Sequence, residues 1–498
     1  MGASREEIVR VRTLGYAGWL DAQFALPQGE TRWDALVAKG FDDISHKNSQ
    51  AGFDAVMWSR LLAAPDTLRQ RVALALSEIL VVSIAGLNAG GWKAFAAAGY
   101  MDLLEAHAFG DHRALMQQVT LSPAMGVYLT YRGSAKASGS SGALPDENYA
   151  RELLQLFTIG LVELNADGTP RLASGNPVPT YGLDDVTGLA RVFTGWDFDQ
   201  GGLSGAAATA TPDFQRRPMI QIGSRHEPGA KSFLGTTIPA GTDAVRGLKL
   251  ALDAICAHPN VGPFLCRQLI QRLVTSNPSA AYVGRVAAVY SNDGSGARGN
   301  LKAVVRALLL DPEARSAGTA SGPAYGKLRE PILRLTGWAR AVRATSVSGA
   351  WAVGDTSDAA TKLGQSPLRS ASVFNFYRPG YVPPATALGS AGLAAPEFQI
   401  TNESSVVGYL NFMQRLVAGT VGDVQGDYSA LLALADNAFA LAQEINLVLA
   451  ANQISAGTTA TITSAVGAMP SGTEMARRNR VHATLLLMLA APEFLVQK

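Results

Sequence analysis

The residue types best suited to chemistry share one face of a helix that the sequence predicts over residues 146–158. Successive helical residues are rotated by about 100°, so five polar side chains fall within an arc of roughly 140°: Glu147, Asn148, Arg151, Glu152 and Gln155. Two carboxylates beside an arginine can hold a general acid and a general base in different protonation states. We therefore predict Glu147 and Glu152 as catalytic residues, and Asn148 and Arg151 as substrate-binding residues. The alternative is an exposed face with an ion pair between Glu147 and Arg151.

A second candidate is the turn HEPGAK, which begins at His226. Its Pro-Gly pair predicts a reversal of the chain that brings His226 and Lys231 side by side. Imidazole and ammonium groups together suit proton transfer or the binding of an anionic or hydroxyl-rich ligand. We predict His226 as a catalytic residue and Lys231 as a substrate-binding residue. The alternative is an ordinary exposed turn.

Aromatic side chains supply a third set of candidates. Trp196 follows a glycine at the end of a predicted helix, where it can stack on a sugar face or fill the core. The segment SVFNFYRPGYVPP over residues 372–384 is rich in aromatics and proline and predicts an extended chain. We predict that Tyr377, Arg378 and Tyr381 line a substrate groove, and that Trp196 is also a substrate-binding residue. Packing of a long loop is the alternative.

The composition excludes several classes of protein. Hydrophobic residues make up 47% of the chain, and 42 basic residues nearly balance 40 acidic ones. This profile excludes a disordered chain. It also provides no strong positive electrostatic field that would attract nucleic acid, so we expect no nucleic-acid partner. No apolar run reaches the twenty or so residues that a bilayer requires, so we expect no membrane span.

Metal and cofactor motifs are missing from the sequence. It has no P-loop, no dinucleotide-binding glycine motif after a strand and no HExxH, and its 6 histidines are scattered. We expect no metal site and no cofactor. Cys256 and Cys266 flank a predicted helix break at Pro259, so they can be either two buried thiols or a disulfide.

Helical periodicity recurs along most of the chain and predicts a mainly α protein. We expect a large multihelical single domain over residues 1–498, with long loops and a few short β-hairpins. Residues 133–144 predict a flexible Gly/Ser loop. Over residues 197–241 we expect an insertion that consists of a long loop with short strands and carries the HEPGAK turn. The predicted helices are Ser4–Leu26, Thr67–Val82, Trp92–Phe109, Arg113–Leu121, Asp146–Thr158, Asp184–Phe193, Thr242–Ala257, Val261–Thr275, Ser279–Tyr290, Leu301–Leu310, Lys327–Ala344, Glu403–Val417, Tyr428–Asn446 and Thr473–Leu489.

Seven segments form a pattern that covers nearly the whole chain: ENYARELLQLFTIGL (Glu147–Leu161), DDVTGLARVFTGW (Asp184–Trp196), HEPGAKSFLG (His226–Gly235), HPNVGPFLCRQLIQRLV (His258–Val274), SVFNFYRPGYVPP (Ser372–Pro384), APEFQITNESSV (Ala395–Val406) and LAAPEFLVQ (Leu489–Gln497). Together they resemble a bacterial family, domain-of-unknown-function family 1800. The resemblance implies an exported protein, periplasmic or secreted, whose export signal is absent from this sequence. It also implies a partner, because members are often encoded beside a protein related to phosphatases and sulfatases.

These observations lead to two functional hypotheses. The first is an exported hydrolase or lyase that acts on a glycan-like or cell-envelope polymer through carboxylate and histidine acid–base catalysis. The second is a non-catalytic helical scaffold or ligand-binding protein that partners the phosphatase/sulfatase-like neighbour. In the second case the charged helix face is an internal ion-pair network.

Overall fold

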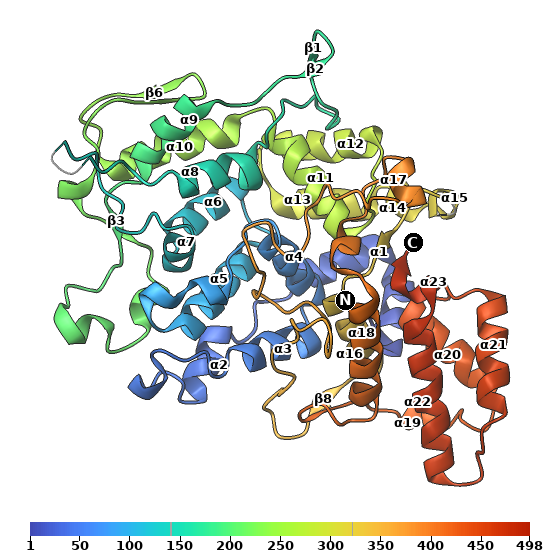
Figure 1. Ribbon diagram of the computed structural model, residues 1–498. Coiled ribbons are helices and arrows are strands. Elements are labelled where there is room, and N and C mark those ends of the chain that lie inside the picture. The colour runs from blue at the N-terminus through green and yellow to red at the C-terminus, as the bar shows by residue number, and fades with distance from the viewer. Residues whose placement is uncertain (140–141, 321) are drawn as a thin grey trace.

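The computed structural model describes residues 1–139, 142–320 and 322–498, and helices dominate it (Figure 1). This confirms the prediction of a mainly α protein. The α-helices are α1 (Arg5–Ala25), α2 (Arg32–Ala38), α3 (Phe53–Ala63), α4 (Thr67–Ser77), α5 (Lys93–His107), α6 (His112–Leu121), α7 (Pro123–Tyr128), α8 (Asn148–Glu152), α9 (Leu183–Ala190), α10 (Ala244–Ala257), α11 (Val261–Leu273), α12 (Ala280–Ser291), α13 (Leu301–Leu310), α14 (Pro312–Arg315), α15 (Ala317–Ala320), α16 (Pro331–Ala341), α17 (Ala387–Ser390), α18 (Glu403–Val417), α19 (Ser429–Leu432), α20 (Ala438–Ala450), α21 (Ala456–Gly467), α22 (Glu474–Ala490) and α23 (Pro492–Leu495).

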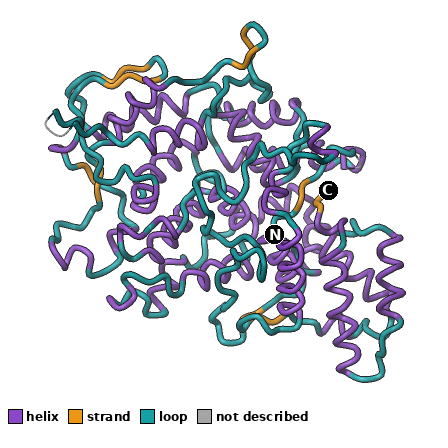
Figure 2. The backbone as a smooth tube through the Cα atoms, viewed as in Figure 1, coloured by secondary structure: helices purple, strands orange, loops and turns teal. Residues whose placement is uncertain are grey.

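The strands are short and lie among long loops (Figure 2), and β1–β2 and β5–β6 are hairpins with two-residue turns. They pair antiparallel as β1 (Leu172–Ala173) with β2 (Asn176–Pro177), β3 (Trp196–Asp197) with β4 (Ile220–Gln221), β5 (Lys231–Phe233) with β6 (Thr236–Ile238), β7 (Lys327–Leu328) with β10 (Val496–Gln497), and β8 (Thr345–Ser346) with β9 (Val424–Gln425). Residues 197–241 contain β4, β5 and β6 and several short 3-10 turns. Within 133–144, residues 140 and 141 lie outside the described residues, and the others form turns and loop.

Buried apolar side chains form two clusters. The first draws mainly on α1 to α13, and the second on α16 to α23. Helix α3 serves both, because Phe53 belongs to the first cluster and Trp58 to the second. The loop between α16 and α18 also joins them, with Leu363 in the second cluster and Leu368 in the first. This loop therefore passes the place where the two clusters meet.

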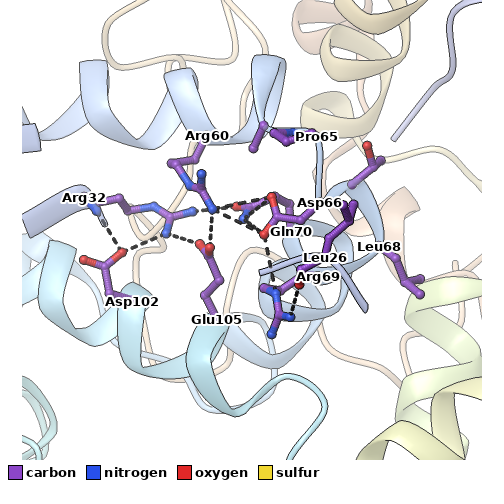
Figure 3. A network of polar contacts seen from close by, with 12 residues as sticks. Leu26, Arg32, Arg60, Pro65, Asp66, Leu68, Arg69, Gln70, Asp102 and Glu105 are labelled. Carbon is purple, nitrogen blue, oxygen red and sulfur yellow. Dashed lines mark hydrogen bonds and ion pairs between the residues drawn. The ribbon is translucent and has the colours of Figure 1, made fainter. Parts of the chain in front are cut away.

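A buried ion-pair network fixes helices α2 to α5 against one another (Figure 3). The Arg32 guanidinium lies 3.0 Å from Asp102 and 2.6 Å from Glu105, and the Arg32 side chain is fully buried. Arg60 binds the other oxygen of Glu105 and lies 3.3 Å from Asp66 at the start of α4. Removing one partner of such a network leaves an unpaired buried charge, which is costly. The network therefore holds the four helices in fixed positions relative to one another.

Several predicted helices begin or end elsewhere than expected. The helix predicted over residues 67–82, for example, ends at Ser77. The predicted helix over residues 428–446 is wrong as a single element, because the Asn437 side chain accepts a bond of 3.0 Å from the Ala440 N–H and starts the new helix α20. The predicted helix over residues 327–344 begins four residues late, at Pro331. Lys327 and Leu328 pair with β10 instead.

Two further sequence questions have structural answers. Cys256 and Cys266 are both buried free thiols, and burial raises the pKa of Cys256 to about 12. Within the described ranges, no helix is both long and apolar enough to cross a membrane.

Candidate functional site

A cavity of about 590 Å³ opens where α4, α11 and the loop between α16 and α18 meet. We call it the central pocket. Its size lies within the range of about 300–1,000 Å³ that is typical of small-ligand sites. Most of its wall is apolar, with a few charged and amide groups, as such sites require. It is lined by Glu78, Ile79, Gln155, Leu156, Gly160, Leu161, Val162, Leu164, Phe264, Gln268, Arg272, Val373, Phe374, Arg378, Pro379, Gly380, Tyr381 and Val382.

Helix α11 presents one face to this pocket. Phe264, Gln268 and Arg272 follow one another at intervals of four residues, which places them on the same side of a helix. Gln268 is buried, and its Nε2 finds no hydrogen-bond partner in the residues that the structure describes. A buried amide without a partner costs free energy, so a ligand that accepts a bond from it gains affinity.

The opposite wall is formed by a π-helical segment, η4 (Leu153–Thr158), which continues α8. The Ile159 N–H donates to the Leu154 carbonyl at 3.1 Å, the i→i+5 pattern of a π-helix. Such segments are rare and occur frequently at functional sites. Gln155 and Leu156 line the pocket from η4.

The end of η4 is held by two specific contacts. Gly160 has a φ of 73°, and a β-carbon there would lie 2.7 Å from the Phe264 ring, so only glycine fits. The buried Asn260 amide donates to the carbonyls of Ile159 at 2.9 Å and Val162 at 2.8 Å. These contacts fix the wall formed by residues 160–164.

The acidic group of the pocket is Glu78, at the C-terminal end of α4. It is 6% exposed, and Arg272 lies 3.5 Å from its Oε2. Burial, followed by the negative charge of Glu330, raises the pKa of Glu78 well above its ordinary value. Burial therefore favours the protonated form of Glu78, the form that can donate a proton into the pocket.

Glu330 is the ionised member of this carboxyl pair. It is fully buried, and its Oε2 accepts hydrogen bonds from Gln365 at 2.8 Å and from the Tyr377 hydroxyl at 2.7 Å. Burial opposes its ionisation, but the neighbouring Glu78 carboxyl and the charges of Lys327 and Arg71 outweigh it and lower the pKa of Glu330. The pKa values of the two carboxyl groups are therefore shifted in opposite directions.

Cations surround the carboxyl pair. Arg71 lies 3.6 Å from Glu330, and Lys327 lies 3.0 Å from Glu397, which is also buried. The Arg272 guanidinium also lies over the Tyr377 ring at 4.8 Å. These contacts hold the polar end of the pocket rigidly.

The mouth of the pocket carries two of the predicted substrate-binding residues. Arg378 is exposed, lies over the Phe374 ring at 4.8 Å, and forms no ion pair with any carboxylate of the described ranges. The Tyr381 carbonyl accepts a bond of 2.8 Å from the Ala395 N–H, which anchors the loop. Tyr377 lies behind the wall, where its hydroxyl binds Glu330.

The predicted residues of α8 lie outside the central pocket. Glu147 accepts bonds from Arg151 at 3.1 Å and from Thr187 of α9 at 2.7 Å. Asn148 is exposed, and its amide lies 3.4 Å from Thr130. Burial raises the pKa of Glu152, whose Oε2 is buried with no hydrogen-bond partner among the described residues.

The HEPGAK turn packs against the end of α9. His226 is buried, and its Nδ1 lies 2.9 Å from the Thr194 carbonyl, while its Nε2 has no partner in the described part of the chain. Lys231 is fully buried and donates to the Gly229 carbonyl at 3.2 Å. Trp196 is 3% exposed and lies in the first apolar cluster, so its ring forms no open wall.

The three predicted motifs meet through packing. Thr187 joins α9 to Glu147, and the Asp185 carboxylate accepts a bond of 2.7 Å from the Leu234 N–H next to β5. Gly188 allows the closest approach, since a β-carbon there would lie 1.8 Å from the Ser232 carbonyl oxygen. None of Glu147, Glu152 and His226 lines the central pocket.

A family model described as "Protein of unknown function (DUF1800)" matches residues 1–496. The chain belongs to this family. No curated protein and no solved structure matches the chain. In this DUF1800 protein, no group of three or more His, Cys, Asp or Glu side chains within the described ranges is arranged to hold a metal ion.

Sequence reasoning assigned no role to the acidic and basic groups of the pocket, Glu78, Arg272 and Glu330. Glu78 and Glu330 lie in separate parts of the chain, and neither belongs to a recognisable motif. The interval of four residues between Gln268 and Arg272 of α11 was an available signal, but Arg267 and Gln271 of the same helix obscure it.

Proposed function

We propose that this protein is a hydrolase or lyase whose active site is the central pocket, with Glu78 as the general acid. The observation that supports this is a buried carboxyl, Glu78, that lines a ligand-sized cavity. Its pKa is raised, whereas the pKa of its neighbour Glu330 is lowered. Pairs of carboxyl groups with pKa values driven apart are typical of acid–base catalysts.

In a hydrolytic cycle, Glu78 donates its proton to the leaving oxygen of the substrate while the carbon–oxygen bond breaks and its electron pair moves to that oxygen. Water adds to the carbon and loses a proton, which returns to the Glu78 carboxylate. Glu330 touches no substrate. Its negative charge keeps the proton on Glu78 between turnovers. Proton donation of this kind contributes about 100-fold to 10,000-fold in rate.

The substrate class is a glycan-like or cell-envelope polymer, taken up by one end. The rings of Phe264, Phe374 and Tyr381 line the pocket and suit the apolar face of a sugar. Gln155 and Gln268 supply amide groups for hydroxyls. Action on such polymers agrees with the periplasmic or secreted location that the sequence resemblance implies.

The test is an activity screen on purified protein with bacterial envelope and environmental polysaccharides. Released reducing ends report hydrolysis, and ultraviolet absorbance of an unsaturated product reports a lyase. We expect Glu78→Gln to lose about 100-fold or more of the activity, whereas Glu474→Gln on the exposed start of α22 keeps it. Full activity of Glu78→Gln contradicts the proposal.

The residues predicted from sequence enter the same assay. Glu147→Gln, Glu152→Gln and His226→Ala each test a catalytic role away from the central pocket. Wild-type activity in all three removes them from the mechanism.

A second proposal is a non-catalytic scaffold that partners the phosphatase/sulfatase-like neighbour. The ion pair of Glu147 with Arg151 and the internal contact of His226 with Thr194 favour it, because the motif residues are then packing groups. Co-purification of the two proteins without turnover of any polymer supports this second proposal.

A further inference from the structure

The charges around the central pocket do not balance. Behind its polar end, Arg71 lies 3.6 Å from Glu330 and Lys327 lies 3.0 Å from Glu397, so each of these two cations has a carboxylate partner. Arg272 lines the pocket itself, and burial opposes ionisation of its partner Glu78, which weakens the compensation of the guanidinium charge. The polar end of the pocket therefore has an excess of positive charge.

A further cation lies at the mouth. The Arg378 side chain is exposed and is oriented by the Phe374 ring at 4.8 Å, and its backbone N–H donates to Gln399 Oε1 at 2.9 Å. The neighbouring Pro379 carbonyl accepts a bond of 3.2 Å from Gln271 of α11. An arginine on an anchored loop, without a carboxylate partner among the described residues, is preorganised for an incoming anion.

Inside the pocket, the Gln268 amide is an uncommitted donor. Its Nε2 is buried and unpaired within the described ranges, and it lies on the α11 face between Phe264 and Arg272. An anionic oxygen can satisfy it, whereas an apolar group cannot. The pocket thus offers two donors to one acidic ligand and aromatic rings for the remainder.

We infer that the central pocket recognises an acidic sugar unit, whose carboxylate or sulfate group is bound by Arg378 and the Gln268 amide. This inference rests on the proposed function for the location of the site and names the substrate class that the site takes. The sugar ring would lie against Phe264, Phe374 and Tyr381, with its bond to the next unit facing Glu78.

Titration calorimetry with D-glucuronate, glucose 6-sulfate, glucose and inorganic sulfate tests this inference. We expect the two acidic sugars to bind at least about tenfold more tightly than glucose, and inorganic sulfate to bind more weakly than either acidic sugar, because it lacks the ring. Preference for glucuronate over glucose 6-sulfate identifies a carboxylate ligand, and the reverse identifies a sulfate ester. Equal binding of glucose, or no binding of either acidic sugar, overturns the inference.

Variants sharpen the test. Arg378→Gln and Gln268→Leu should each weaken binding of the acidic sugar by about tenfold to a hundredfold. Arg246→Gln, an exposed arginine of α10, should leave it unchanged. Retention of full affinity in both pocket variants overturns the inference.

The pH dependence provides a separate readout. Affinity for the acidic sugar should fall as the pH is raised from neutral to alkaline values, because Glu78 ionises and repels the anion. This fall should be absent in Glu78→Gln. An acidic sugar that binds in this way to a protein without any polymer-cleaving activity contradicts the proposed function alone. A cleaved neutral polymer with no acidic-sugar binding contradicts this inference alone.

Discussion

Two chemically identical substitutions, Glu78→Gln and Glu330→Gln, should have very different effects on stability. Burial raises the pKa of Glu78 and so favours its neutral acid, which a neutral amide of the same shape would replace. We expect Glu78→Gln to change the free energy of unfolding by about 1 kcal/mol or less, the worth of one ordinary hydrogen bond. Arg272, at 3.5 Å, keeps its bond to the Glu78 carbonyl, and its stacking on Tyr377 is unaffected.

Glu330→Gln removes a fully buried negative charge. Arg71 and Lys327 then lose the negative charge of Glu330, which compensates their positive charges. The substitution also disturbs the hydrogen bonds that Glu330 accepts from Gln365 at 2.8 Å and from Tyr377 at 2.7 Å. Breaking a buried ion pair by removing one partner costs about 3–5 kcal/mol. We therefore expect Glu330→Gln to be less stable than Glu78→Gln by about 3 kcal/mol.

Urea unfolding of both purified variants at neutral pH, followed by circular dichroism, measures this difference. The pH dependence of the free energy of unfolding provides a second test, because the direction of its change is also predicted. Because the folded pKa of Glu78 is raised, its proton stabilises the fold at low pH, and this contribution is lost as the pH rises through the folded pKa. In Glu78→Gln, which has no titrating group at this position, this decrease in stability with rising pH should be absent. Equal destabilisation by the two substitutions, or a larger loss for Glu78→Gln, refutes the protonation assignment.

Two further predictions concern packing in parts of the fold that do not line the central pocket. Burial lowers the pKa of His112 to about 4, so stability should fall as the pH drops from about 6.5 to about 4, by about 3 kcal/mol in total. His112→Gln should reduce this acid sensitivity in a pH titration of circular dichroism, and an unchanged profile contradicts the assignment. Gly188→Ala should cost about 1–3 kcal/mol or more in thermal unfolding, because its β-carbon would lie 1.8 Å from the Ser232 carbonyl oxygen. Gly247→Ala in α10 has open space and should not destabilise, so equal effects at the two glycines disprove the close approach.

Local sequence signals predict the helical fold well. Helix α13 was predicted with the bounds that the structure has, and its start is fixed by the Asn300 side chain, which accepts a bond from Ala303 N–H at 3.2 Å. The π-helix could not be predicted in this way, because a helical wheel assumes a constant rotation of about 100° per residue. The wheel therefore placed Gln155 with Glu147 and Glu152, whereas only Gln155 reaches the central pocket.

The candidate site was predicted only at its mouth. Arg378 and Tyr381 stood out as a polar and aromatic cluster in a proline-rich loop, and both line the pocket. The carboxyl pair could not be found, because Glu78 and Glu330 come together only through the packing of α4 against the start of α16. Their different protonation states arise from burial and from Arg71 and Lys327, which no local pattern encodes.

The central claim, that Glu78 is the acid of an active site in the central pocket, is tested most directly by kcat/KM against pH on a cleaved polymer. Wild-type protein and Glu78→Gln are compared side by side. We predict that the wild-type rate falls toward alkaline pH as Glu78 ionises, and that Glu78→Gln is about 100-fold or more slower and lacks this fall. A Glu78→Gln protein with the wild-type rate and the wild-type pH profile would contradict the claim.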